Sequence, residues 1–150
     1  MRLLAIGKGG GPERTLFDRY AKRIKPALAL VELPDGVGAP AEIKRREASA
    51  LLAALKPDEF VIALDQDGTA PDSPELAHRL AGWMERSRKL AFIIGGAEGL
   101  DATLLARAGA RLSLGRLTWP HMLVRPMLAE QIYRAQMILA GHPYHRAGRP

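Results

Sequence analysis

The chain has 150 residues, no cysteine and a formal net charge of +6. This length fits one domain around a single core, and the lack of cysteine excludes disulfides, thiolate metal sites and cysteine nucleophiles. No apolar run is long enough to span a membrane and the first residues form no signal-peptide core, so we expect a cytoplasmic protein whose positive charge favours a nucleic-acid partner.

Short apolar runs alternate with helical patterns along the chain. A short apolar run bounded by turn residues is typical of a buried strand. Such runs predict strands at residues 2–6, 27–33, 60–64, 90–94 and 110–114. Periodic apolar side chains predict the first two helices at residues 13–24 and 41–55. The side chains expected to face inward are Leu16, Tyr20 and Ile24 in the first of these helices, and Ala48, Leu51, Leu52 and Leu55 in the second.

The later elements carry start and stop signals. Residues 65–68 are predicted to form a turn after the third strand. Ser73 is expected to cap the next helix, with Pro74 at its first position and Leu76, Leu80 and Trp83 or Met84 along its apolar stripe. A short helix is predicted at residues 101–108. The last and longest helix must hold Pro126 in its first turn or at a kink, and it stops at Gly141.

Alternating strands and helices predict an α/β fold with a mostly parallel five-stranded sheet and helices on both faces. No repeat or long linker divides the chain, so residues 1–150 are expected to form a single domain. Ligands of open parallel sheets bind at the carboxyl ends of the strands. Three of these ends carry glycine or polar residues, at residues 64–65, 94–99 and 114–120.

The last quarter of the chain, residues 111–146, joins a long helix to a tail rich in His, Tyr and Arg. One interpretation is an amphipathic helix with a solvated basic end. Another comes from five runs: Leu117-Thr118-Trp119-Pro120-His121, Leu123-Val124-Arg125, Leu128-Ala129-Glu130-Gln131, Tyr133-Arg134-Ala135 and Pro143-Tyr144-His145-Arg146. In these runs and in residues 92–100 the chain resembles the RlmH family, the pseudouridine N3-methyltransferases of the SPOUT (trefoil-knot) superfamily. The first sixty residues match that family only in pattern.

The resemblance implies a single SPOUT domain with a C-terminal trefoil knot, a homodimer, and S-adenosylmethionine as methyl donor without a metal. It also implies methylation of N3 of a pseudouridine in large-subunit ribosomal RNA, with the assembled ribosome as substrate. The family's cofactor positions carry over onto Leu64, Gly96, Gly115, Arg116, Leu117, Thr118, Trp119 and Pro120.

Methyl transfer to a ring nitrogen requires that the acceptor be held in line and lose a proton. The candidate proton acceptors are His145, Tyr144 and Glu130, and a histidine has the most suitable ordinary pKa. The candidates for binding RNA phosphate or a uracil carbonyl are Arg125, Arg134 and Arg146. Arg134 is equally placed to pair with the acid four residues before it. His121 is expected only to begin the helix.

Two other functions stay open. Gly7-x-Gly9-Gly10-Gly11 follows the first strand and Glu32 ends the second, which resembles part of a Rossmann-type nucleotide-binding pattern. Pro12 stands where the third glycine of that pattern belongs, so we expect a mobile basic loop there instead. The basic faces of the first two helices also fit a non-catalytic ribosome- or RNA-binding protein, which would have no use for S-adenosylmethionine.

Overall fold

The computed structural model describes residues 1–146. In chain order the elements are β1 (Arg2–Ile6), α1 (Gly11–Ala21), β2 (Ala29–Leu33), α2 (Pro40–Ala54), β3 (Phe60–Thr69), α3 (Ser73–Arg86), β4 (Leu90–Ile94), α4 (Ala102–Arg107), β5 (Ala110–Leu112) and α5 (His121–Leu139). Within this described part, no helix is both long and apolar enough to cross a membrane.

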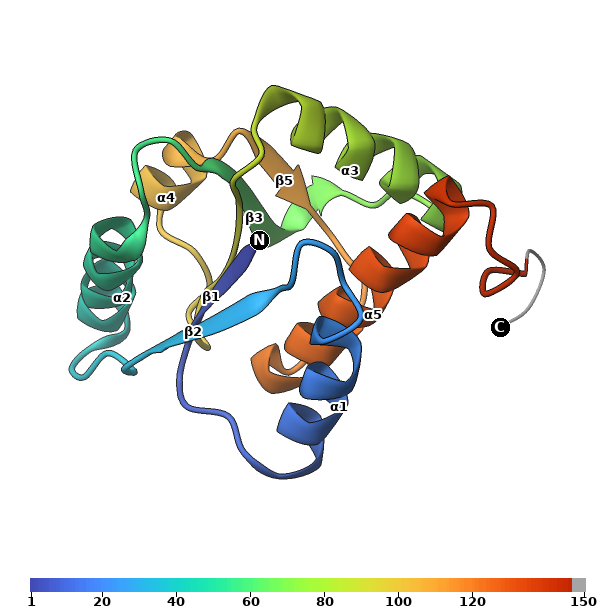
Figure 1. The fold of residues 1–150 in the computed structure, drawn as a ribbon. Coiled ribbons are helices and arrows are strands. Elements are labelled where there is room, and N and C mark those ends of the chain that lie inside the picture. Colours follow the sequence, from blue (N-terminus) through green and yellow to red (C-terminus); the bar gives the residue numbers. More distant parts are fainter. Residues whose placement is uncertain (147–150) are drawn as a thin grey trace.

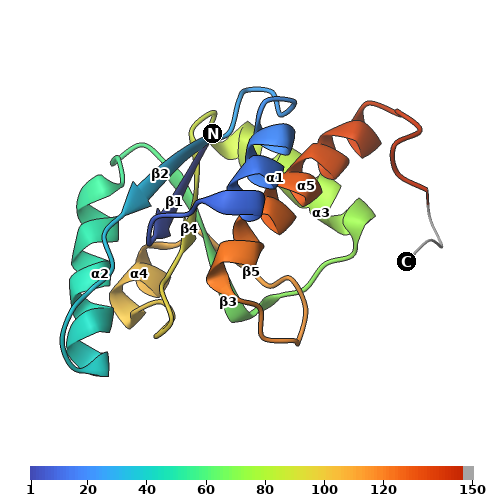
Figure 2. The ribbon, with the colours of Figure 1, turned by 90° about the horizontal axis from the view of Figure 1, so that it is seen from below.

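All five strands run parallel, in the order β2-β1-β4-β3-β5. Helices α2 and α4 cover one face of the sheet, and α1, α3 and α5 cover the other (Figure 1, Figure 2). Because the strands are parallel, their carboxyl ends all meet at one edge of the sheet. The predicted α/β fold with helices on both faces is confirmed.

Two of the three inner strands match their predicted bounds. Both β1 and β4 have the predicted ends, and every residue of β4 is buried. Strand β4 lies between β1 and β3 with helices on both sides, so each of its side chains enters a core. On one side Phe92 packs edge-on against Trp83 of α3, with 6.4 Å between ring centroids. The edge strands are shorter than predicted, since β2 begins at Ala29 and β5 ends at Leu112.

The predicted inner faces of the first two helices are partly wrong. Helix α1 ends at Ala21 and buries Phe17 and Ala21, whereas Leu16 is 43% exposed. Ile24 lies beyond the end of the helix but is buried as predicted, and Tyr20 is half-buried against the same core. In α2, Ala48 and Leu51 are buried as predicted, but Leu52 is 37% exposed. The acid Glu47 is buried on that helix instead, with only 4% exposure.

The predicted turn at residues 65–68 is a bulge inside a longer strand. Strand β3 pairs with Leu112 of β5 twice, first through Leu64 and again through Thr69. The four residues between these two pairings are pushed out of the sheet at its carboxyl edge. Gly68 allows this, because a Cβ there would lie 2.8 Å from the backbone nitrogen of Leu112.

Helix α3 begins one residue earlier than predicted. Asp72, rather than Ser73, is the N-cap: its carboxylate accepts a 2.8 Å hydrogen bond from the backbone N–H of Glu75, whose own carboxylate accepts from the N–H of Asp72 at 3.2 Å. This reciprocal pair is a capping box. The predicted apolar stripe is confirmed, with Leu76, Leu80 and Trp83 buried.

Helix α5 carries Pro126 as its sixth residue, just beyond the first turn. Proline has no N–H to donate to the preceding turn, so packing on α1 and α3 has to hold the helix together there. The predicted stop is confirmed: Ala140 is the C-cap, and Gly141 follows with φ +65°, the left-handed conformation that favours glycine at this position.

The capping box predicts a difference between two adjacent substitutions. Asp72→Ala removes the carboxylate that bonds the N–H of Glu75, so it should lower the free energy of unfolding by about 1 kcal/mol. Ser73→Ala removes a hydroxyl whose nearest partner is the Gln131 side chain at 3.5 Å, so it should change stability far less. Urea denaturation at one fixed protein concentration measures both, and a larger loss from the serine variant would contradict the capping assignment.

Candidate active site

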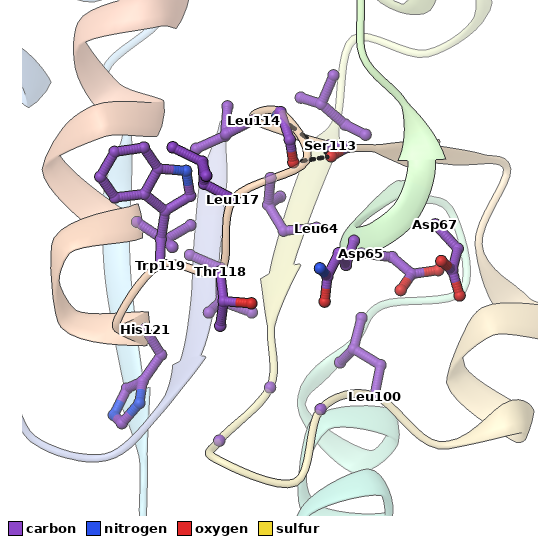
Figure 3. Close-up of a pocket in the computed structure, with 18 residues that line it drawn as sticks. Leu64, Asp65, Asp67, Leu100, Ser113, Leu114, Leu117, Thr118, Trp119 and His121 are labelled. Atoms are coloured by element: carbon purple, nitrogen blue, oxygen red, sulfur yellow. Dashed lines mark hydrogen bonds between the residues drawn. The ribbon is translucent and has the colours of Figure 1, made fainter.

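A cavity of about 310 Å³ lies at the carboxyl edge of the sheet, where β3, β4 and β5 end. This volume is at the lower end of the range for small-molecule sites. Figure 3 shows Leu117, Thr118 and Trp119 on one side of it, with Asp65, Asp67 and Leu100 on the other. The three strand ends predicted to carry a ligand therefore do form one pocket.

The first wall is the bulge of β3. It brings Leu64, Asp65 and Asp67 to the pocket. Asp65 has a cationic neighbour, since its carboxylate lies 3.7 Å from the guanidinium of Arg111. Asp67 is exposed to solvent, so water screens its charge.

The second wall is the glycine turn after β4. The N–H of Gly99 donates a 3.1 Å hydrogen bond to the carbonyl of Gly96, and a Cβ on Gly95 would lie 2.9 Å from the Gly99 carbonyl. A Cβ on Gly96 would lie 2.7 and 2.8 Å from the two carboxylate oxygens of Glu47 on α2. Side chains are thus excluded at Gly95 and Gly96, and the backbone there borders the pocket directly.

The third wall is the segment between β5 and α5. The Ser113 hydroxyl donates to the carbonyl of Gly115 at 2.9 Å and accepts from its N–H at 3.2 Å, which fixes the turn after the strand. Leu117 is 70% exposed and Trp119 is 38% exposed, although both line the pocket. Exposed apolar side chains beside a cavity are surface that a ligand would cover.

Six of the eight predicted cofactor positions line this pocket: Leu64, Gly96, Gly115, Leu117, Thr118 and Trp119. Arg116 and Pro120 belong to the same loop but are not among the lining residues. Within residues 1–146, no cluster of His, Asp and Glu is placed to hold a metal ion.

His121 is a pocket residue that the sequence interpretation missed. It is the first residue of α5 and lines the cavity, and its Nε2 is buried without a hydrogen-bond partner. Buried polar atoms nearly always have a partner, so an unpartnered one at a cavity wall fits a polar ligand group. Leucine walls, open glycine backbone and this nitrogen together suit an amphipathic ligand such as S-adenosylmethionine. The spacing of apolar residues in the sequence cannot reveal a buried nitrogen that lacks a hydrogen-bond partner.

The predicted catalytic residues form a separate cluster around Glu130 of α5. Its Oε1 accepts from Arg134 at 2.5 Å and from the Tyr144 hydroxyl at 3.0 Å. Its Oε2 accepts from Gln131 at 2.7 Å and from Arg134 Nε at 3.4 Å. Both oxygens are therefore engaged in hydrogen bonds within the chain.

The tail packs onto the helix that precedes it. Tyr144 meets the ring of Tyr133 edge-on, with 4.9 Å between centroids, and His145 Nδ1 lies 3.5 Å from a guanidinium nitrogen of Arg134. Burial, with hydrogen bonding to Tyr20 and Glu130, raises the pKa of Tyr144. This phenol keeps its proton at neutral pH and cannot act as a base in this position. Arg146 is exposed.

The tail does not complete the pocket of its own chain. The pocket lies at His121, the start of α5, whereas the tail follows Leu139 at its end. The tail packs back along α5 only as far as Glu130, which follows His121 by nine residues, about 14 Å along the helix axis. Within one chain the tail therefore stays on α5 and does not reach the glycine loops that form the pocket.

A second hollow, of about 490 Å³, lies between α1 and the middle of α5. It shares the segment from Leu112 to Gly115 with the first pocket, so the two cavities are neighbours across one strand end. Leu16 and Tyr20 of α1 line it on one side, and Glu130 lies on the other.

Arg125 has a position that argues against contact with RNA. It is 3% exposed, and one guanidinium nitrogen donates to the carbonyls of Ile6 and Gly7 at 2.6 and 2.8 Å. The other donates to Glu32 at 2.8 Å. Burial lowers the pKa of this guanidinium, and the neighbouring Glu32 opposes that effect. The side chain thus joins α5 to the ends of β1 and β2.

The same contacts contradict a nucleotide site at the first glycine loop. Glu32 accepts from the backbone N–H of Gly9 at 2.6 Å as well as from Arg125, so it is not free to bind a ribose. The cavity beside Gly9 measures only about 10 Å³. A hydrogen bond ties the loop to β2 at Gly9, and the mobility of the rest of the loop stays a prediction.

Comparisons with known proteins agree with this geometry. A family model described as "Predicted SPOUT methyltransferase" matches residues 1–145. The chain is similar to proteins named ribosomal RNA large subunit methyltransferase H: 61% identical to that of Acidiphilium cryptum, over 100% of this chain and 96% of the relative. It is 58% identical to that of Gluconacetobacter diazotrophicus, over 100% and 99%. A solved probable methylase family protein from Haemophilus influenzae, 13% identical, has a similar fold with a TM-score of 0.59 over 99% of this chain and 71% of that one.

The burial of Arg125 predicts a loss of stability when it is removed. Arg125→Ala removes the donor to two backbone carbonyls and the buried ion pair with Glu32, which should cost about 3–5 kcal/mol of unfolding free energy. Arg116→Ala, at an exposed arginine near the pocket, is the matched control and should stay within about 0.5 kcal/mol. Urea denaturation compares the two. Equal stability of both variants would show that Arg125 does not hold α5 to the sheet.

Proposed function

This chain belongs to the SPOUT methyltransferase family, and we propose that it transfers a methyl group from S-adenosylmethionine to N3 of a pseudouridine in large-subunit ribosomal RNA. The proposal is supported most strongly by one observation: the three strand-end loops at which the chain resembles the RlmH family line a single pocket. Relatives 58–61% identical over the whole chain carry the name of a ribosomal RNA large subunit methyltransferase.

When bound, S-adenosylmethionine supplies a methyl group from a positively charged sulfur. The residues of the chain have to hold that group, orient it and exclude water. Leu64, Leu100 and Leu117 offer apolar walls, while the backbone after β4 and the His121 Nε2 offer polar contacts. Positioning of this kind accounts for several kcal/mol of a reaction barrier.

The acceptor nitrogen loses its proton as it gains the methyl group, so a base has to stand near the pocket. Among the three candidates, Glu130 already accepts four hydrogen bonds and Tyr144 keeps its proton. His145 is the remaining one, and histidine is the side chain that most often serves as a general base.

We further propose a homodimer in which the tail of one protomer reaches the pocket of the other. Within a single chain His145 lies against Arg134 of α5 and does not line the pocket, so we assign a base on the tail to the site of a second copy. Leu16 and the hollow beside it leave apolar surface on α1 and α5 uncovered. Such surface is typical of an interface between protomers.

The substrate side of the proposal rests on charge. Four basic residues at the end of α1 and just after it are exposed: Arg19, Lys22, Arg23 and Lys25. They form a surface that suits RNA phosphates and predicts salt-sensitive binding to the ribosome. The same surface fits the alternative of a non-catalytic RNA-binding protein, which titration with S-adenosylmethionine distinguishes.

The pocket assignment predicts the effect of shortening one exposed leucine. Leu117→Ala removes apolar surface that the bound cofactor would cover, so S-adenosylmethionine should bind about 5- to 30-fold more weakly. Since Leu117 is 70% exposed without ligand, thermal stability should not change. Val37→Ala is the matched control, because Val37 is 72% exposed and lies outside the pocket. Isothermal titration calorimetry measures all three proteins, and equal affinities would remove Leu117 from the site.

The dimer proposal predicts complementation between two inactive variants. Leu117→Lys places a cation against the cationic cofactor, and His145→Ala removes the base. If the tail acts in trans, each mixed dimer keeps one intact site, so random mixing should restore about a quarter of wild-type activity. If the tail acts within its own chain, every site in the mixture is damaged and no activity returns. Methyl transfer to ribosomes is the readout, and each variant alone is the control.

A further inference from the structure

Glu47 is a buried acid without a cationic partner. Its residue is 4% exposed, and it takes part in none of the ion pairs among residues 1–146. One oxygen, Oε1, accepts a 3.0 Å hydrogen bond from the backbone N–H of Gly36. The other, Oε2, is buried with no hydrogen-bond partner. A carboxylate held in this way is costly, since neither water nor a counter-charge offsets its desolvation.

This carboxylate lies directly behind the second wall of the pocket. A Cβ on Gly96 would stand 2.7 Å from Oε2, so only the backbone of the turn separates the acid from the cavity that Gly96 lines. The other acids near the pocket differ from it. Asp65 has Arg111 as a neighbour and Asp67 is exposed to water, so both charges are compensated or screened.

We propose that Glu47 supplies the counter-charge for a cationic ligand in this pocket and thereby favours the sulfonium donor over its neutral product. This inference rests on the proposed function. S-adenosylmethionine carries one positive charge more than S-adenosylhomocysteine, from which the methyl group has departed. A buried charge behind a thin wall acts through a medium that screens it weakly. Glu47 is therefore a positioning and specificity-determining residue that acts on the charge of the ligand without touching it.

The test is Glu47→Gln, which has nearly the same shape and keeps an oxygen to accept from the N–H of Gly36. The affinity for S-adenosylmethionine should fall by about 3- to 30-fold, while the affinity for S-adenosylhomocysteine stays the same. Isothermal titration calorimetry of both ligands against the wild type and the variant gives the ratio. Glu42→Gln is the matched control, because Glu42 is on the same helix, is only half-buried and pairs with Arg46, and its ratio should not change.

Thermal denaturation without ligand separates this role from a structural one. If Glu47 is an uncompensated charge, Glu47→Gln should melt at the wild-type temperature or above it; a lower melting temperature, with both ligands weakened alike, would overturn the proposal. Should that variant not fold, Glu47→Asp keeps the charge and should keep the wild-type ratio; a ratio shifted against the sulfonium would overturn the proposal. Failure of the wild type to bind either ligand would instead refute the proposed function.

Discussion

The order of the sheet is the constraint on which the site depends. The ends of β3, β4 and β5 belong to residues near 64, 95 and 113, which lie far apart along the chain. They meet only because the strands are parallel and β3 lies between β4 and β5. Strand β5 has three residues and, within residues 1–146, pairs with β3 alone. A small element thus brings the third wall to the pocket, and the two pairings across the bulge hold it there.

The fold was predictable where burial is uniform and harder to predict where it is not. Strand β4 is apolar throughout because both of its faces are covered, so its bounds follow from the sequence. Helix α1 is half-covered and has apolar residues on neighbouring positions, so composition alone does not tell whether Leu16 or Phe17 faces the core. The bulge of β3 was predicted as a turn, since a glycine that lets two backbones approach has the same sequence signal in both cases. The trefoil knot stays a prediction.

The loops that form the site were predicted from the sequence, but the packing and hydrogen bonds of its side chains were not. Loops at strand ends can be located from the sequence once the sheet is parallel. The role of an arginine cannot be predicted in this way. The sequence does not distinguish Arg125 from Arg146, and only packing makes the first buried and the second exposed. The same holds for the tail, whose distance from the pocket depends on the length of α5. His121 and Glu47 were missed because an unpartnered buried atom is a property of packing and leaves no sequence pattern.

The unpartnered atoms of His121 and Glu47 suggest how the pocket binds its ligand before and after methyl transfer. His121 Nε2 can bind a polar group whatever its charge, so it serves donor and product alike. The carboxylate of Glu47 distinguishes them, because its attraction depends on a positive charge in the cavity. Loss of the methyl group removes one positive charge, and the attraction weakens at the moment when the product has to leave. The buried carboxylate of Glu47 lowers the stability of the empty protein. Its role in ligand exchange explains why it is there, because folding free energy is lost at a site where binding needs a charge.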